Sequence, residues 1–183
     1  MQKKETTPTS PAPTSTPINT PIPCSGVINF PDSNLENIIR QAIGKPSGDI
    51  YASDLAGLTS LDASSSNITN ITGLQCCTNL QSLDLSYNNI SDINALSGLS
   101  NLQSLYLSSN NISDINALSG LTNLQWLNLS SNYISDITAL VTNCDKGGLG
   151  SGDFLYLNNN PLSSQAINTD IPFLQSKGVN IYY

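Results

Sequence analysis

A unit of 22 residues, repeated three times with little change, constrains this chain more than any other feature of its sequence. The segment LQSLDLSYNNISDI starts at Leu80, returns as LQSLYLSSNNISDI at Leu102, and returns again as LQWLNLSSNYISDI at Leu124. Degenerate copies flank these three, one over 58–71 and one over 155–162. One such unit cannot bury its own apolar face, so neighbouring units must stack into a solenoid.

The pattern LxxLxLxxNxI inside each unit predicts its local structure. The LxL part alternates between two faces, as a strand does, so Leu83 and Leu85 would point into the core while Asp84 points outward. The asparagine that follows can hydrogen-bond backbone groups that would otherwise be buried without a partner. This asparagine recurs at Asn88, Asn110, Asn132 and Asn160. A unit of this length is short for a full α-helix on its return side, where we expect 3₁₀ turns or extended segments.

This is the leucine-rich repeat pattern, and it predicts an α/β solenoid. We expect a short horseshoe with a parallel sheet on its concave face, an N-terminal helical cap and a C-terminal cap. By composition, residues 1–23 are a disordered linker or stalk rich in Thr and Pro, and 24–57 are the N-terminal cap. The repeats then occupy 58–162, and the C-terminal cap occupies 163–183.

Both caps carry recognisable helix signals. In the N-terminal cap, apolar residues at helical spacing predict a helix over about 33–43. These residues are Leu35, Ile38, Ile39, Ala42 and Ile43. Ser33 and Glu36 fit a capping box at the start of this helix, and Gly44 fits its end. In the C-terminal cap we expect one or two short helical pieces before a last strand over 179–183. The glycine-rich stretch 143–153 is expected to form a protruding loop.

Residues 27–140 resemble the leucine-rich repeat domains of internalins, which are surface proteins of Gram-positive bacteria. The resemblance rests on the motif INFPD at 28–32, the cap helix, the segment DLAGLTSLDA at 54–63, and the Asn-x-Ile-Ser-Asp-Ile ending of each repeat. It implies a secreted or cell-surface recognition module that takes part in adhesion. The sequence carries no immunoglobulin-like inter-repeat domain, LPxTG sorting signal or GW module, so wall attachment is not expected, and no receptor contact is carried over.

Charge and composition exclude several function classes. The chain has 6 Lys and Arg against 13 Asp and Glu, a net charge of −7 that would repel a phosphate backbone, so nucleic acid is excluded as a partner. No run of consecutive apolar residues is long enough to cross a membrane, so membrane insertion is not expected. Histidine, the commonest general base and metal ligand, is absent, and we expect neither an enzyme nor a cofactor. Asp62 and Asp84 would be neighbours, as glycosidase carboxylates are, but an exposed pair lacks the pocket that raises one pKa.

Outward residues of successive strands would form columns on the concave face, with neighbours about 5 Å apart. The first half of this face is small and polar or acidic, and the second half is aromatic. We predict a ligand-binding site formed by Asp62, Asp84, Tyr106, Trp126, Asn128, Phe154 and Tyr156, which Tyr182 could extend. Trp and Tyr are enriched at binding hot spots, and exposed aromatic patches are typical of interaction sites. We expect Trp126 to lie exposed between Tyr106 and Phe154 or Tyr156. The alternatives are that these rings cover the C-terminal cap or reflect sequence drift in a decaying repeat.

Three functions remain open at this point. The first is recognition of a protein ligand through the concave face, in adhesion or receptor binding. The second is a structural role, as a rigid subunit or spacer of an extracellular assembly. The third is a glycan-binding adhesin that uses the aromatic residues.

Two smaller features also leave alternatives. Cys77 falls in a core column and should act as a small buried apolar residue, whereas the sequence does not decide whether Cys24 pairs with Cys76. Aspartates recur at Asp92, Asp114 and Asp136. We expect them to be solvated turn residues that accept a local backbone N–H, with a calcium site as the alternative.

Overall fold

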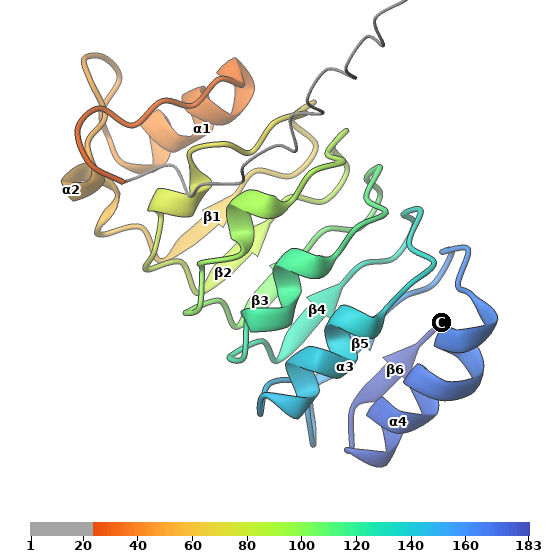
Figure 1. The fold of residues 1–183 in the computed structure, drawn as a ribbon. Coiled ribbons are helices and arrows are strands. Elements are labelled where there is room, and N and C mark those ends of the chain that lie inside the picture. The colour runs from red at the N-terminus through yellow and green to blue at the C-terminus, as the bar shows by residue number, and fades with distance from the viewer. Residues whose placement is uncertain (1–23) are drawn as a thin grey trace, which may run out of the picture.

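Strands that are one repeat apart pair in parallel throughout the described part of the chain, residues 24–183, in the computed structural model (Figure 1). The strands are β1 (Ser60–Asp62), β2 (Ser82–Asp84), β3 (Ser104–Tyr106), β4 (Trp126–Asn128), β5 (Phe154–Tyr156) and β6 (Asn180–Tyr182). They form one six-stranded sheet in chain order, and the predicted solenoid is confirmed. The linker predicted at 1–23 lies outside the described residues.

Short helical turns occupy the side opposite the sheet (Figure 1). They are the 3₁₀ turns η1 (Leu74–Cys76), η2 (Asn94–Leu96) and η3 (Asn116–Gly120), followed by the helix α3 (Thr138–Asp145). The expected 3₁₀ turns are therefore confirmed for the regular repeats. The α-helix forms only where the spacing between strands grows from 22 to 28 residues, from Leu127 to Leu155, because the longer unit has room for two turns.

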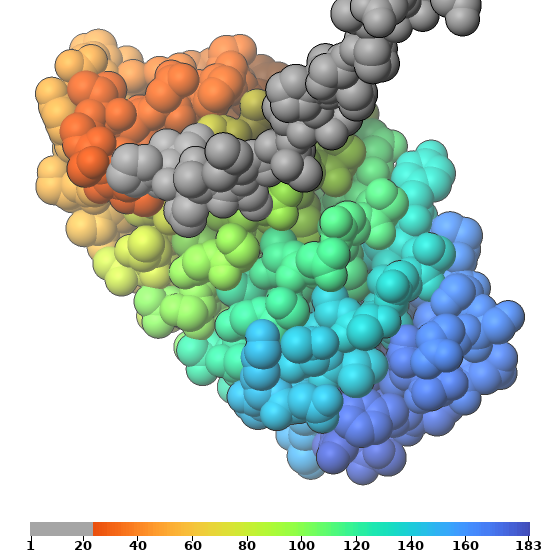
Figure 2. Space-filling view, viewed as in Figure 1, coloured from red at the N-terminus to blue at the C-terminus, as the bar shows by residue number. Residues whose placement is uncertain are grey.

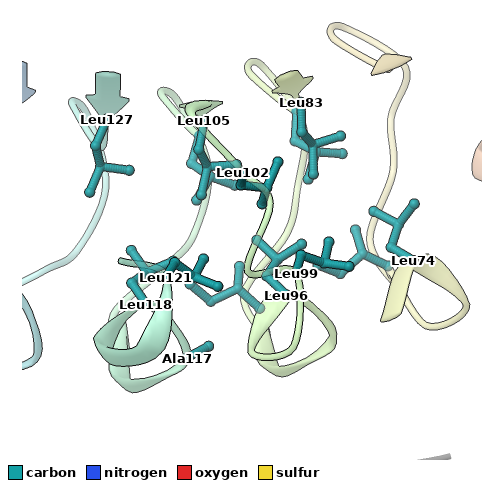
Figure 3. Packing of buried hydrophobic residues seen from close by; sticks show 14 of the residues in the cluster. Leu74, Leu83, Leu96, Leu99, Leu102, Leu105, Ala117, Leu118, Leu121 and Leu127 are labelled. Carbon is teal, nitrogen blue, oxygen red and sulfur yellow. The ribbon is translucent and has the colours of Figure 1, made fainter. Parts of the chain in front are cut away.

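The core lies between these two sides and is built from stacked rows of leucine. Figure 3 shows Leu83, Leu105 and Leu127 of the strands facing Leu99 and Leu121 of the return side. All five side chains are fully buried. Because every turn repeats the same positions, each leucine packs on its equivalents in the turns before and after, as the 22-residue period predicts.

The column of asparagines joins each turn to the one before it. The side-chain Oδ1 of Asn88 accepts a hydrogen bond from the backbone N–H of Ile68 at 2.9 Å. Its Nδ2 donates to the carbonyl oxygens of Ala63 at 2.8 Å and Leu85 at 2.9 Å. Asn110, Asn132 and Asn160 make the equivalent bonds one turn further on each time. The predicted role of this column is thus confirmed.

The N-terminal cap consists of α1 (Ser33–Ala42) and α2 (Ala52–Leu55), and it lies against the first turns of the repeat (Figure 2). The helix predicted over 33–43 is confirmed, and Leu35 and Ile39 are fully buried. The predicted capping box is wrong. Asp32, not Ser33, is the N-cap, and its carboxylate accepts from the backbone N–H groups of the first helical turn. Glu36 does not reach back to the cap, because it forms an ion pair with Arg40 at 2.8 Å.

Gly44 ends α1 as predicted. Its φ of +65° is in the left-handed region, where glycine has no Cβ penalty. The N–H groups of Gly44 and Lys45 donate to the carbonyl oxygens of Gln41 and Arg40 at 3.2 and 2.9 Å. This pair of bonds is a Schellman motif, which satisfies carbonyls that the helix end leaves without partners.

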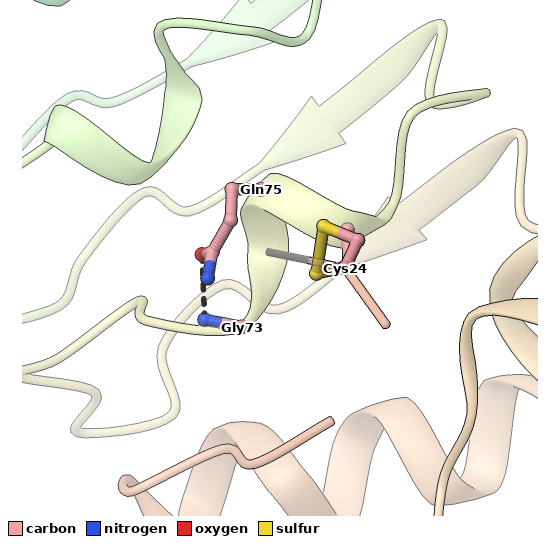
Figure 4. The surroundings of a disulfide bond; sticks show 4 residues. Cys24, Gly73 and Gln75 are labelled. Carbon is pink, nitrogen blue, oxygen red and sulfur yellow. Dashed lines mark hydrogen bonds between the residues drawn. A yellow bond between two sulfur atoms is a disulfide. The ribbon is translucent and has the colours of Figure 1, made fainter. Parts of the chain in front are cut away.

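A disulfide joins Cys24 to Cys76, which resolves the pairing that the sequence left open (Figure 4). The two Cα atoms lie 5.3 Å apart. The bond links the segment that precedes α1 to η1 of the repeats. Cys77, the next residue, is buried and not disulfide-bonded, as predicted for a core column. Burial raises the pKa of its thiol to about 12, so this side chain remains protonated and apolar.

The C-terminal cap matches its prediction, with a π-helical turn η4 (Ala166–Asp170), the helix α4 (Ile171–Ser176) and then β6. The prediction of a protruding loop over 143–153 is right only in part, because 143–145 belong to α3, while 146–153 form a partly exposed loop that is anchored by buried Leu149. Asn143 lies in α3, is fully buried, and donates to the carbonyl oxygens of Leu118 and Leu121, both at 3.0 Å. The backbone N–H of Leu149 donates to the Oδ1 of Asn143 at 2.8 Å, and the Leu149 side chain is only 1% exposed. An apolar anchor and a buried amide therefore fold this stretch onto the core.

Candidate ligand-binding face

The outward side chains of the six strands form two columns on the concave face. The first column is Ser60, Ser82, Ser104, Trp126, Phe154 and Asn180. The second is Asp62, Asp84, Tyr106, Asn128, Tyr156 and Tyr182. All seven side chains that the sequence predicts for a binding site therefore lie on one face and in register. Their placement follows directly from the parallel pairing, in which Leu61, Leu83, Leu105, Leu127, Leu155 and Ile181 occupy the inward position between the columns.

Four of the aromatic side chains form a contiguous cluster, which we call the aromatic row: Trp126, Phe154, Tyr156 and Tyr182. The ring centroid of Trp126 lies 4.9 Å from that of Phe154 and 5.3 Å from that of Tyr156. Tyr156 in turn stacks on Tyr182, with centroids 4.7 Å apart and planes 9° from parallel. Such pairs stabilise their arrangement by about 0.5–1.5 kcal/mol beyond the area they bury. These contacts therefore preorganise the side chains of the aromatic row in the absence of a ligand.

Two expectations about this row need correction. Trp126 was expected to lie exposed between Tyr106 and the rings of β5, but its ring contacts, within residues 24–183, are with Phe154 and Tyr156 alone. Because it packs on two rings, Trp126 is half-buried. Tyr182, which the sequence offered only as an extension, is a full member of the row, and it is 47% exposed. The signal for it was the alternation in Asn180–Tyr182, which places Ile181 inward as in the LxL strands.

The opposite end of the face is acidic. Asp62 and Asp84 occupy the same column on adjacent strands. The Oδ1 of Asp62 accepts from the backbone N–H of Ser64 at 3.0 Å and from its hydroxyl at 2.7 Å. These bonds hold the pKa of Asp62 below its ordinary value, so this carboxylate is charged at neutral pH. The Oδ1 of Asp84 accepts from the N–H of Ser86 at 2.8 Å, and Asn128 makes the same kind of bond to Ser130 at 3.0 Å.

The other carboxylate oxygen of each aspartate, Oδ2, takes no part in these bonds. Within the described residues neither Oδ2 accepts a hydrogen bond, and neither aspartate forms a salt bridge. The two columns contain no basic residue. Arg40 and Lys45 pair instead with Glu36 and Asp54 in the N-terminal cap. The charge of this end of the face is therefore available to a ligand.

The aspartate ladder on the far side of the solenoid has the predicted turn role. The Oδ1 atoms of Asp92, Asp114 and Asp136 each accept the backbone N–H of the residue two positions on, all at 2.8 Å. Across residues 24–183, no three or more His, Cys, Asp and Glu side chains gather in a way that could hold a metal ion. No helix of the same region is long and apolar enough to span a membrane.

Comparison with known families supports the repeat assignment. A leucine-rich repeat model matches residues 78–134, and a model of two leucine-rich repeat copies matches residues 57–98. Among curated proteins, no sequence matches this chain.

Solved structures extend the comparison. An internalin, InlF from Listeria monocytogenes, is 33% identical over 83% of this chain and 42% of its own, with a TM-score of 0.69. The functional domain of InlJ from the same organism, which includes a cysteine ladder, is 30% identical over 73% of this chain and 28% of its own, with a TM-score of 0.63. A leucine-rich repeat protein of Leptospira interrogans shares the fold at 21% identity, covering 71% of this chain and 38% of its own, with a TM-score of 0.56.

The chain spans less than half the length of these internalin structures. The similarity nevertheless covers most of residues 24–183, and it joins sequence identity to the same arrangement of strands and turns. The chain therefore carries a leucine-rich repeat domain that is similar in sequence and fold to those of Listeria internalins.

Proposed function

We propose that this chain is an extracellular or cell-surface recognition module that binds a protein ligand through its concave face. The observation that carries the proposal is the aromatic row, which sits on a face that no other part of the described chain covers. Trp and Tyr are the residues most enriched at the energetic centres of protein interfaces, because they bring large apolar area at a small cost in conformational entropy. A ring cluster already packed by its own contacts loses still less entropy on binding.

The disulfide supports the proposed location. Disulfides persist in oxidising compartments such as the cell exterior and are rare in the cytosol, so the Cys24–Cys76 bond favours an extracellular site of action. The similarity to internalins points the same way. A net charge of −7 also favours a soluble, dispersed module over one that binds anionic surfaces.

The alternatives are separated by one experiment on the full chain. The chain would be immobilised and exposed in parallel to an array of purified extracellular proteins and to a glycan array, with Trp126→Ala as the test variant. Ser60→Ala, in the same column at the other end of the sheet, is the matched control. We expect saturable binding to a protein that Trp126→Ala weakens by about thirtyfold or more, as loss of a hot spot does, and that Ser60→Ala leaves unchanged.

Two results would contradict the proposal. Binding that is confined to glycans, and is lost in Trp126→Ala, would favour the glycan-binding adhesin. Concentration-dependent self-association in light scattering, with no binding on either array, would favour the structural subunit.

A further inference from the structure

The rings of the aromatic row pack against one another. Tyr156 and Tyr182 are nearly parallel with centroids 4.7 Å apart, a separation that requires overlapping faces, as in an offset stack. Trp126 lies against Phe154 and Tyr156 at interplanar angles of 35° and 36°. These three contacts therefore occupy ring faces inside the row.

Trp126, at the β4 end of the row, has ring partners among the described residues on one neighbouring strand only. Both ring partners of Trp126 belong to β5, the neighbour of β4 on the side away from β3. On the other side, the in-register neighbour of Trp126 is Ser104 of β3. A serine side chain is too small to cover an indole, and Tyr106 makes no ring contact with Trp126 within residues 24–183. Within the described residues, Trp126 therefore makes no ring contact on its β3 side, where the row ends.

The charges beyond this end of the row are negative. Asp84 of β2 is paired in register with Tyr106, and Ser82 of β2 is paired with Ser104. Strands lie about 4.8 Å apart, so a group held above Ser104 is one strand spacing from both the strand of Trp126 and the strand of Asp84. The electron-rich face of an indole attracts cations, within about 6 Å of the ring centre. A cation above Ser104 would meet the ring face and the carboxylate together.

We infer, resting on the proposed function, that the protein ligand inserts a lysine or arginine side chain above Ser104, where its cation stacks on Trp126 and pairs with Asp84. Asp62, in the next position of the same column, adds its field to the site without a direct contact. Small Ser82 and Ser104 leave room for the aliphatic part of the side chain. The neighbouring row then packs against the apolar surface of the ligand around this anchor.

Trp126 is the only tryptophan of the chain, so its fluorescence reports on this site alone. The probe is a capped Gly-Ser-Arg-Ser-Gly peptide at low salt, compared with peptides in which lysine, citrulline or glutamate replaces the arginine. Citrulline has the shape of arginine without its charge. We expect a saturable change in emission with the arginine and lysine peptides and none with the citrulline and glutamate peptides.

Three variants of the full chain locate the effect. Asp84→Asn should weaken the arginine peptide by about two- to fivefold, the range of an exposed ion pair. Asp145→Asn, a loss of the same charge at the exposed end of α3, should leave binding unchanged. Ser104→Arg should abolish it, because the chain's own guanidinium then fills the site, while Ser104→Gln should only reduce it.

The inference is overturned if the citrulline peptide changes the emission as much as the arginine peptide, if Asp84→Asn binds as well as the wild type, or if the arginine peptide gives no change at all. These outcomes are distinct from failure of the proposed function. A protein ligand that is lost in Trp126→Ala but retained by Asp84→Asn and Ser104→Arg would keep the concave face as the binding site and reject the cationic anchor.

Discussion

Asp32 and Thr69 are joined through one carboxylate oxygen, Oδ2, which accepts the backbone N–H of Thr69 at 2.8 Å and its hydroxyl at 3.2 Å. The same oxygen also accepts the N–H of Asn70 at 3.2 Å. The other oxygen, Oδ1, accepts the N–H groups of Asn34 and Leu35 at 3.0 and 3.3 Å and so begins α1. A single side chain therefore caps the helix and fastens it to the first turn of the repeat.

This arrangement makes the stability of the N-terminal cap depend on pH. Partial burial raises the pKa of Asp32, but the backbone hydrogen bonds from Thr69, Leu35 and Asn70 outweigh it, and the net pKa lies below the ordinary value. We expect Asp32→Ala to cost about 1–3 kcal/mol at pH 7. Because the folded-state pKa is depressed, this stabilisation is complete above the unfolded pKa, about 3.9, and is lost as pH falls through the folded value.

The measurement is a thermal melt of wild type and Asp32→Ala at pH 7 and at successively lower pH. The gap in Tm between the two should be constant down to about pH 5 and close at lower pH. Asp145→Ala, at an exposed position, serves as the control. A gap that persists unchanged at the lowest pH would mean that the carboxylate charge contributes nothing to the cap.

Leu105 tests the register of the core. Its side chain is fully buried with turns on both sides, so Leu105→Ala should cost about 2–5 kcal/mol, as other buried leucine truncations do. Urea denaturation followed by circular dichroism gives the free energy of unfolding, with exposed Ser113→Ala as a reference. A loss below about 0.5 kcal/mol, the range of neutral surface changes, would be incompatible with this packing.

Two adjacent asparagines provide a matched pair for the hydrogen-bonded column. Asn110 is buried and bonds to the backbone of Ile90, Leu85 and Leu107, whereas the neighbouring Asn111 is exposed. Asn110→Ala leaves the buried N–H of Ile90 without a partner, whereas the carbonyl oxygens of Leu85 and Leu107 keep Asn88 and Asn132 as donors, and it should cost about 1–3 kcal/mol. Asn111→Ala should stay within about 0.5 kcal/mol of wild type. If both variants lose the same free energy of unfolding in denaturant titrations, the buried asparagines stabilise the fold no more than exposed ones do.

Truncation tests the N-terminal cap as a whole. Removal of residues 1–23 should leave Tm unchanged if the cap begins at Cys24, as the composition of the sequence predicts. Removal of residues 1–45 deletes α1 and half of the disulfide, exposes the edge of β1, and should cause unfolding or aggregation. Differential scanning calorimetry with light scattering distinguishes these results, and identical melts for both truncations would contradict the cap assignment.

Trp126 also offers a check that needs no ligand. Its side chain is half-buried and packs on two rings, so acrylamide should quench its emission to an intermediate degree in the native state and more strongly after unfolding. An emission that acrylamide does not quench in the native state would place this side chain in the core and remove the basis for the binding face.

The repeat made most of the fold predictable. Alternation in LxL determines which side chains of each strand face outward, and the constant period determines their partners, so the placement of Asp84 or Trp126 needs no information beyond the sequence. The asparagine column was equally predictable, because a polar side chain at a recurrent buried position must satisfy backbone groups.

Features that depend on long-range geometry were less predictable. Ser33 and Asp32 are both good N-cap residues, and the choice between them depends on bonds to Thr69 and Asn70, which only the folded cap brings near. The pairing of Cys24 with Cys76 joins positions 52 residues apart. Stacking in the aromatic row depends on side-chain rotamers, which periodicity does not determine. Asn143 breaks the repeat spacing, so its buried role could not be recognised by alignment with the other asparagines.

The disulfide has a mechanical consequence. If the chain is pulled from the N-terminal side of Cys24, the force passes through the sulfur bridge into η1 and bypasses everything between the two cysteines, including α1, α2 and β1. At about 3.5 Å per extended residue, roughly 180 Å of contour length is thereby locked against extension. Under tension the first element to bear load is η1, and the N-terminal cap carries none of the applied force.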